Sequence, residues 1–454
     1  MTRHRSPVLR LLAMGMVIAV SHDSGVLGHP LRPPTGSLVG SGASGNIGLI
    51  GVVPITDVTD VVVNANRTHA FAVTAGGASC STAAGTWIFD ITTTQAPAAL
   101  EFIPLPKDSR PGGAIQVVEI TTVSFSGEIL VIPLQRCAPN GVGGISLVDV
   151  SNPNRPKKLI EGASDFKHDA PDTVAAFAWD GGTRAFVAVA DAGVVGGIDV
   201  YDITVPKKPS LVARWDLTTL HPAVAETGPF LLTEFGVQNL AVKVIAGHRV
   251  MLLAYLDGGF ILLNVNDVTT PVLIADTDYG AADPELLERT GVQLPPEGSA
   301  HHAAFTANNQ FLIGVDQDLA PFGGPSAEFD GWGYVHLYVN GSGKLAQVDS
   351  YATPEAFDAA FAVGFGDLSA HEVATHPSDA RFAYVAYRAG GLRSLEIQCA
   401  SSFSCELVEI GRYLDPSGND FSGIEAFVRP RDGATIVLAS DVGSGVWMFQ
   451  ASLP

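Results

Sequence analysis

The chain has 454 residues, a formal net charge of −20 at pH 7 and a sequence pI of about 4.8. A surface that acidic repels nucleic acid and anionic lipid, so it excludes those two classes of partner and favours cations or basic partners. Charged residues make up only 16% of the chain, whereas there are 49 glycines and 29 prolines, a balance typical of many short apolar strands joined by turns.

The first 21 residues have the layout of a secretory signal peptide. Three arginines precede an apolar run from Leu11 to Val20, and small residues follow at a cleavage position. The run has about ten residues, whereas a membrane-spanning helix needs about 20. We therefore expect a signal peptide at 1–21 and no transmembrane segment, with an uncleaved anchor as the alternative. The mature protein is expected to be secreted, extracellular or associated with the cell surface.

Residues 22–45 are rich in Gly, Pro and Ser and are predicted to form a linker ahead of one domain, 46–454. In that domain a turn motif recurs, with Asp or Asn at the end of an apolar strand and a proline seven positions later. The copies are FDITTTQAP at Asp90, VDVSNPNRP at Asp149, YDITVPKKP at Asp202 and NVNDVTTP at Asn264. They lie 59, 53 and 62 residues apart, a period that suits a four-stranded propeller blade with loop insertions.

The segments ISLVDVSNPNRP and IDVYDITVPKKP resemble the LVIVD-repeat family of bacterial exported β-propellers, over residues 52–275 and more weakly over 299–414. The resemblance implies a propeller fold and an extracellular or cell-surface location. Alternating apolar strands predict an all-β, seven-bladed propeller. The predicted blades are at about 57–105, 114–161, 172–217, 236–277, 300–351, 369–414 and 422–450.

The last predicted blade shows only three strands. A strand at 46–53 is predicted to complete it and close the ring, because closure leaves no open sheet edge. A six-bladed ring with an irregular end is the alternative. Long loops are predicted on one rim of the ring, and loops on a rigid scaffold are where binding is expected.

The four cysteines predict two disulfides in an exported chain. Cys80 and Cys137 occupy the same loop class in the first two blades and are predicted to pair on the long-loop rim. Cys399 and Cys405 flank the outer hairpin of the sixth blade and are predicted to close it. Free or differently paired thiols are the alternative.

A tripeptide is repeated where two neighbouring blades begin, as Ser299-Ala300-His301 and Ser369-Ala370-His371. Equal register predicts that His301 and His371 lie close together at the channel mouth. Imidazoles with nearby carboxylates suit a transition metal, and carboxylates alone suit Ca²⁺, so these two histidines are candidate metal ligands. A plain polar lining and contact with a small ligand are the alternatives. The further residues expected around this mouth are His302, Glu372, Gln238, Asp60, Asp316 and Asp318, with Thr173 near the same ring.

Two acidic loops, 328–333 and 415–420, carry carboxylates that suit Ca²⁺, but neither has the ligand spacing of an EF-hand loop, so solvated turns are expected. The sequence also has no nucleophile elbow, zinc-protease helix, phosphate loop or dinucleotide fingerprint. The leading hypothesis is therefore a monomeric, non-enzymatic scaffold that binds an unidentified protein or small molecule through the long-loop rim and channel mouth. No catalytic residue and no definite cofactor are assigned.

The rival hypothesis is a metal-assisted, lactonase-like hydrolase. HHAAFTANNQFLIGVDQDL and HEVATHPSDARFAYVAY are similar to inner-strand hairpins of the seven-bladed lactonase family related to 6-phosphogluconolactonase. That resemblance implies that His301 and His371 bind a metal or move protons. It further implies that Glu372 or Asp316 acts as the base.

Overall fold

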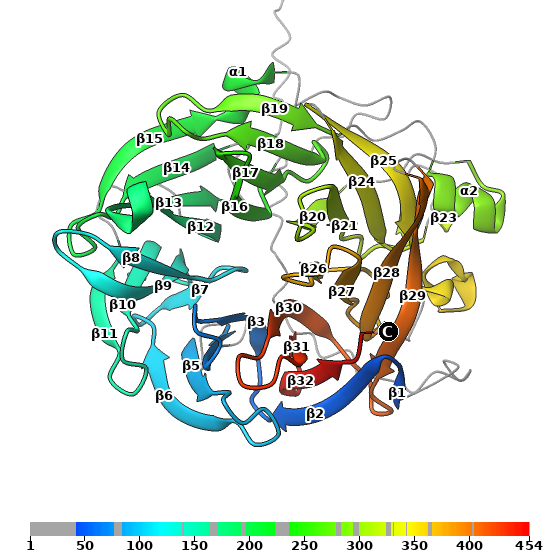
Figure 1. Ribbon diagram of the computed structural model, residues 1–454, viewed down its shortest axis with the longest axis horizontal. Coiled ribbons are helices and arrows are strands. Elements are labelled where there is room, and N and C mark those ends of the chain that lie inside the picture. The colour runs from blue at the N-terminus through cyan, green and yellow to red at the C-terminus, as the bar shows by residue number, and fades with distance from the viewer. Residues whose placement is uncertain are drawn as a thin grey trace, which may run out of the picture.

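The computed structural model describes residues 42–453 apart from 77–83, 139, 163–170, 192–196, 223–235, 278–282, 294–298, 324–327, 330, 342, 362–365 and 402–403. Seven antiparallel sheets of four or five strands surround one axis, so the chain is a seven-bladed β-propeller (Figure 1). The predicted fold class is confirmed, and each sheet coincides with a predicted blade to within a few residues. The six-bladed alternative is wrong.

The blades are numbered here in chain order, and each runs from an inner strand at the axis to an outer strand. Blade 1 is β3 (Val58–Val63), β4 (His69–Thr74), β5 (Gly85–Asp90) and β6 (Ala98–Pro104). Blade 2 is β7 (Ser109–Pro111), β8 (Gln116–Thr121), β9 (Ser126–Arg136), β10 (Gly144–Asp149) and β11 (Lys157–Glu161), with β7 and β8 both paired to β9. Blade 3 is β12 (Pro171–Trp179), β13 (Arg184–Asp191), β14 (Gly197–Asp202) and β15 (Ser210–Asp216). Blade 4 is β16 (Asn239–Ile245), β17 (His248–Ala254), β18 (Phe260–Asn264) and β19 (Val272–Asp276).

The remaining blades contain the small additions to the ring. Blade 5 is β20 (Ala300–Phe305), β21 (Phe311–Asp316), β24 (Val335–Gly341) and β25 (Lys344–Tyr351). Blade 6 is β26 (Glu372–Thr375), β27 (Phe382–Ala386), β28 (Leu392–Ser401), β29 (Ser404–Leu414) and β1 (Gly42–Gly45). Blade 7 is β30 (Phe421–Val428), β31 (Thr435–Asp441), β32 (Gly445–Ala451) and β2 (Ile47–Val53). The short elements outside the blades are β22 (Phe322–Gly323), β23 (Glu328–Phe329), α1 (Leu217–Leu220), α2 (Pro284–Thr290), η1 (Asp180–Gly182), η3 (Pro354–Phe357) and η4 (Ala359–Phe361).

The N-terminal segment closes the ring. Strand β2 pairs antiparallel with β32, from Ile47 opposite Ala451 to Val53 opposite Val446, which confirms the predicted closure of the last blade. Strand β1, which lies in the predicted linker, adds a fifth strand to blade 6 by pairing with β29. One short segment therefore bridges two neighbouring blades. Residues 1–41, which contain the predicted signal peptide and most of the predicted linker, lie outside the described residues.

The repeated Asp or Asn forms the same turn in the first four blades. Its side chain accepts the backbone N–H two residues along, which is the Asx turn that favours Asp and Asn at such positions. The four bonds are Thr92 N to Asp90 Oδ1 at 2.8 Å, Ser151 N to Asp149 Oδ1 at 3.1 Å, Thr204 N to Asp202 Oδ1 at 2.8 Å and Asn266 N to Asn264 Oδ1 at 3.0 Å. The repeated sequence motif therefore forms the same hydrogen-bonded turn in each of these four blades.

Glycine pairs precede the third strand of several blades, and close backbone approach explains two of them. Gly259 and Gly391 have φ of 76° and 81°, in the left-handed region that disfavours side chains. A Cβ at Gly259 would lie 2.4 Å from Thr277 Oγ1, and one at Gly391 would lie 2.2 Å from the Tyr413 carbonyl oxygen. Only glycine fits where the third strand turns into its sheet.

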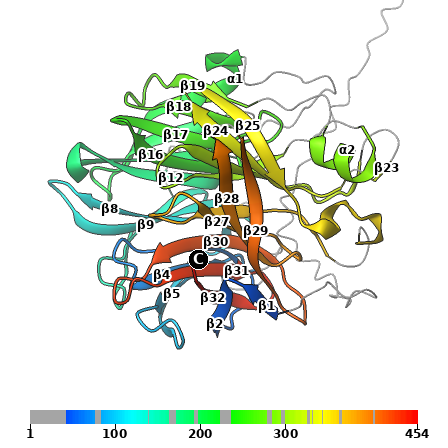
Figure 2. The same ribbon diagram turned by 45° about the vertical axis from the view of Figure 1, so that its right-hand side comes forward.

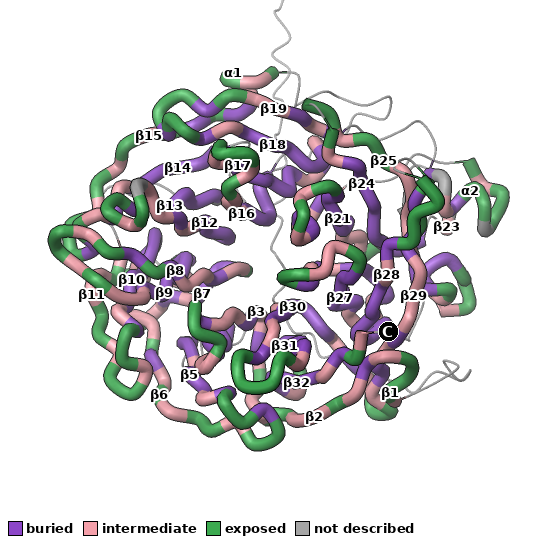
Figure 3. The backbone as a smooth tube through the Cα atoms, in the orientation of Figure 1, coloured by how far each residue is buried: buried purple, intermediate pink, exposed green. Residues whose placement is uncertain are grey.

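Hydrophobic packing is distributed evenly around the ring. Each of the seven blade-to-blade interfaces has its own cluster of buried apolar residues, and an eighth cluster lies at the rim of blades 5 and 6. Figure 3 shows the buried backbone within the sheets and the exposed backbone at the loops. Each blade therefore buries both faces against its neighbours.

The disulfide predicted for the sixth blade is confirmed. Cys399 and Cys405 lie opposite each other at the end of the β28–β29 hairpin and are bonded. Cys137 is also disulfide-bonded, whereas Cys80 lies outside the described residues, so its predicted pairing with Cys137 stays a prediction.

Parts of each long loop expected on one rim also lie outside the described residues. Of the parts described, α2 and the β22–β23 hairpin project beside the ring (Figure 2). No helix in the described ranges has the length and apolar character needed to cross a bilayer.

Candidate functional site

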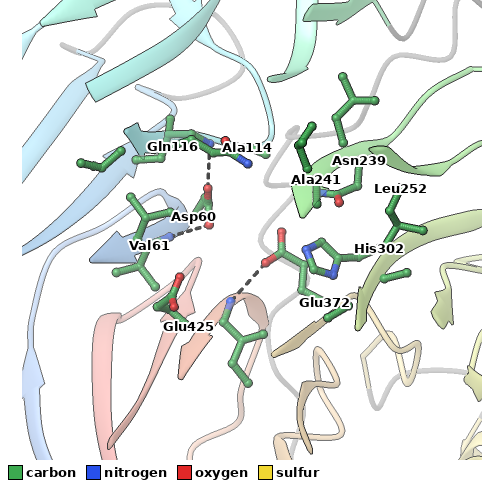
Figure 4. Close-up of a pocket in the computed structure, with 18 of the residues that line it drawn as sticks. Asp60, Val61, Ala114, Gln116, Asn239, Ala241, Leu252, His302, Glu372 and Glu425 are labelled. Carbon is green, nitrogen blue, oxygen red and sulfur yellow. Dashed lines mark hydrogen bonds between the residues drawn. The ribbon is translucent and has the colours of Figure 1, made fainter. Parts of the chain in front are cut away.

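A cavity of about 400 Å³ lies in the channel at the centre of the ring (Figure 4). Its walls come from the inner strands of blades 1, 2, 4, 5, 6 and 7, with Leu252 of β17 behind them. Cavities of 300–1,000 Å³ with mainly apolar walls and a few polar groups are typical of small-molecule sites. The polar residues that line this one are Asp60, Gln116, Asn239, Lys243, His302, Glu372 and Glu425.

Strand register places four of these residues at one level of the channel, here called the upper ring. Each of the four lies on the inner strand of its blade, opposite a residue near the end of the second strand. The chain turns into the third strand just beyond that residue. The pairs are Asp60 with Val73, Asn239 with Ala254, His302 with Val315 and Glu372 with Ala386. Because the four residues lie at the same level of their blades, their side chains face one space although they are far apart in the sequence.

Glu425 and Gln116 lie two positions deeper, at a level here called the middle ring. Glu425 pairs with Leu438, three residues before Asp441, just as Ala304 pairs with Ile313, three residues before Asp316. Blades 3 to 6 have alanine at the corresponding positions, so the middle ring is wide. The middle-ring alanines are Ala175, Ala241, Ala304 and Ala374.

Asp60 is held rigidly by the backbone of two blades. Its Oδ1 accepts the Val61 N–H at 2.7 Å, and its Oδ2 accepts the N–H of Ile115 in blade 2 at 2.8 Å. Burial raises the pKa of Asp60 to about 6, although both hydrogen bonds favour the ionised form. The carboxyl therefore titrates close to neutral pH.

Glu372 makes the corresponding contact between blades 6 and 7. Its Oε2 accepts the N–H of Ile424 at 3.1 Å. Burial raises the pKa of Glu372 well above its usual value, and the negative charge of Asp60 raises it further. The two carboxyls therefore resist being ionised together.

Glu425 is the third acid. Burial raises its pKa to about 7, and the charge of Asp60 adds to the effect. Across the described part of the chain, none of these three carboxyls forms an ion pair with a basic side chain. The cavity therefore gathers three carboxyls without an ion-paired base among the described residues, although the more distant charges of Arg388 and Arg67 lower the pKa of Glu372 and of Glu425, respectively.

His302 and Asn239 complete the upper ring on the opposite side. Burial lowers the pKa of His302 to about 4, so the imidazole is neutral at pH 7. Its Nδ1 accepts the Val373 N–H at 3.4 Å, which leaves the proton on Nε2. Asn239 is only 8% exposed, and its side-chain amide has no hydrogen-bond partner among the described residues. This side of the ring therefore offers neutral polar groups.

The predicted proximity of His301 and His371 is found in the structure, where their ring centroids are 4.2 Å apart. His301 Nδ1 donates to the His371 carbonyl oxygen and His371 Nδ1 donates to the Ser422 carbonyl oxygen, both at 2.8 Å. Ser422 Oγ in turn donates to the Thr59 carbonyl oxygen at 3.0 Å. These bonds link blades 5, 6, 7 and 1 one residue above the cavity lining, so both histidines tie blades together at the channel mouth.

Burial lowers the pKa of His371 well below its usual value, and neighbouring His301 and Arg388 lower it further. No group of three or more His, Cys, Asp or Glu with the arrangement of a metal site occurs among the described residues. The metal-binding role of His301 and His371 stays a prediction.

The other predicted site residues lie in different places. Asp316 is buried inside blade 5, where its Oδ2 lies 2.8 Å from His336 Nε2. Asp318 donates its backbone N–H to Ser369 Oγ at 3.0 Å, and Gln238 donates its own to the Ala254 carbonyl oxygen at 2.9 Å. Thr173 pairs with Ala190 of the next strand at the upper-ring level of blade 3. Of the eight predicted residues, the cavity is lined by Asp60, His302 and Glu372.

Sequence reasoning missed Glu425, Gln116, Asn239 and Lys243. A signal for Glu425 was present, because it is a single acid within the apolar inner strand FSGIEAFV. A charge inside a buried strand is costly and therefore points to function or to a partner.

No family model and no curated protein matches the chain. Among solved structures, the crystal structure of Chaetomium thermophilum Raptor is similar over 91% of this chain and 30% of that chain, at 10% sequence identity and a TM-score of 0.49. The fold assignment above rests on the strand pairings of the chain itself. The resemblance to the LVIVD-repeat family stays a prediction.

Proposed function

We propose that the protein is an exported, non-enzymatic propeller that binds a small organic cation in its central channel. The observation that carries the proposal is the convergence of Asp60, Glu372 and Glu425 on one cavity without a cationic partner in the described chain. A buried charge is stable only when it is paired, so these carboxyls either hold protons or hold a positive group. Signal-like residues 1–21 and the disulfide support export.

The walls of the cavity favour an organic cation. Apolar side chains such as Val61, Leu240 and Phe305 line it alongside the acids, so a ligand with a hydrocarbon part gains from burial at about 25 cal/mol per Å². The neutral His302 and Asn239 add hydrogen-bonding groups without adding charge. Specificity would come from the three carboxyls and affinity in part from the apolar walls.

The direct test is calorimetric titration of the secreted protein with n-hexylamine at about pH 5 and about pH 8, where the amine stays protonated. We expect tighter binding at the higher pH, because Asp60 and Glu425, with pKa of about 6 and about 7, lose their protons in between. Glu425→Gln is expected to weaken binding by about tenfold or more at the higher pH. The matched control Glu406→Gln, on the exposed outer strand of blade 6, is expected to bind normally.

Equal affinity at both pH values, or an unaffected Glu425→Gln variant, would contradict the proposal. The same preparation tests the hydrolase alternative. Turnover of a lactone that is lost in His301→Ala would replace the binding proposal.

A further inference from the structure

A lone cation lines the far end of the same cavity. Lys243 of β16 donates from Nζ to the Thr306 carbonyl oxygen of blade 5 at 3.1 Å. Burial lowers its pKa, and it has no acidic ion-pair partner in the described part of the chain. A carbonyl oxygen occupies only one of the three ammonium donors, so the charge of Lys243 is uncompensated.

The lysine and the acids are separated along the channel. Lys243 lies four residues beyond Asn239 on the same strand, so it is about 13 Å of strand below the upper ring at about 3.3 Å per residue. The middle ring, with Glu425, is two positions deep, which leaves about 7 Å of strand between its level and that of Lys243. The walls between these levels are small or apolar, and include Ala241, Ala304 and Phe305.

The cavity is thus acidic toward the long-loop rim and basic toward the opposite rim. A ligand with only an ammonium group would satisfy the carboxyls and leave Lys243 without a counter-charge. A ligand with only a carboxylate would be repelled by three acids. Complementary charges at the two ends fix the direction in which a ligand lies as well as its affinity.

We propose, on the basis of the function proposed above, that the ligand is a linear zwitterion, an ω-amino acid or a chain of similar length. Its ammonium lies among Asp60, Glu372 and Glu425, its carboxylate pairs with Lys243, and its hydrocarbon chain crosses the alanine-lined middle ring. The unpartnered amide of Asn239, 8% exposed and facing the cavity at the level of the acids, supplies a further hydrogen bond at the ammonium end.

The test compares 6-aminohexanoate, n-hexylamine and hexanoate as calorimetric probes of the full secreted chain at about pH 8. We expect 6-aminohexanoate to bind at least about tenfold more tightly than n-hexylamine, and hexanoate not to bind. Lys243→Met, which keeps the length of the stem, is expected to abolish that preference without weakening the binding of n-hexylamine, because it removes a positive charge that repels the amine. Lys243→Arg should keep the preference, and Lys344→Met, on the exposed outer strand of blade 5, serves as the control.

The outcomes separate the two proposals. If n-hexylamine binds and 6-aminohexanoate binds no better, the zwitterion is wrong and the cation site stands. If neither amine binds, both proposals fall. A preference that survives in Lys243→Met would also overturn the assignment of Lys243, and unchanged unfolding of that variant in urea confirms that its ring is intact.

Discussion

Buried acids in two parts of this ring differ in the side chains that contact them. Inside blade 5, Asp316 lies 2.8 Å from His336, and both side chains are 4% exposed. In the channel, Asp60 and Glu372 receive backbone N–H bonds from the following blade, but no basic side chain pairs with them or with Glu425 in the described chain. Asp316 thus has an imidazole partner within its own blade, whereas the channel acids have the composition of a site that awaits a positive group.

The difference shows why burial alone does not identify a functional acid. Asp316, Asp60 and Glu372 are all buried, yet Asp316 alone of these three contacts an imidazole, because β21 and β24 place it near His336. The channel acids come from three blades and meet only at the axis. Burial raises the pKa of all three acids, and the charge of Asp60 raises the pKa of Glu372 and of Glu425 further.

The largest expected change in the free energy of unfolding comes from removing the carboxyl of Asp316, which is paired with His336. Asp316→Ala is expected to lower the free energy of unfolding by about 3 kcal/mol, because it leaves the buried His336 Nε2–H without its acceptor. Urea denaturation of the variant measures this, with exposed Glu119→Ala as the control. n-Hexylamine binding should survive in the folded variant, and its loss would show that the two groups are not independent.

Replacing a channel acid is expected to change the free energy of unfolding by a smaller amount and in the opposite direction. The folded pKa of Glu425, about 7, exceeds its ordinary value of 4.5, so the folded state favours the proton and stability falls as pH rises between those values. Glu425→Gln removes this cost and is expected to stabilise the protein by about 1–3 kcal/mol at about pH 8 and by little at about pH 4. Urea denaturation at both pH values measures it. Destabilisation at the higher pH would mean that Glu425 already has a counter-charge.

The smallest effect on stability is expected from filling the middle ring. Ala304→Leu adds apolar volume to a cavity rather than to a packed core, so the free energy of unfolding should change by less than about 1 kcal/mol. Binding of n-hexylamine should nevertheless be lost, since the added side chain occupies the ligand's space. The matched variant Ala346→Leu, on the exposed outer strand of the same blade, should bind normally. Retained binding in Ala304→Leu would place the ligand elsewhere.

Much of the architecture was predictable because it is encoded locally. Asp90, Asp149, Asp202 and Asn264 each form an Asx turn from their own side chain, so the blade period is readable in the sequence. The missing fourth strand of the last blade pointed to 46–53, and β2 occupies that place. The proximity of His301 and His371 followed from equal register in adjacent blades.

The site was only partly predictable. Asp60, His302 and Glu372 were found because they stand at the start of inner strands, where the repeat gives the register. Asp316 was expected at the channel and lies instead against His336, because it is the last residue of the second strand, β21, which pairs with β24, the strand that carries His336. Glu425 was missed because its level depends on how blade 7 aligns with the others across the ring.

The number of blades, the turns that join their strands and the segment that closes the ring are encoded in the sequence, since each depends on residues close together in the chain or on a repeated pattern. Which side chains share the channel is set by the assembled ring. That sharing depends on the register of seven sheets around one axis, and a shift of one residue in any inner strand would turn its channel residue into the blade.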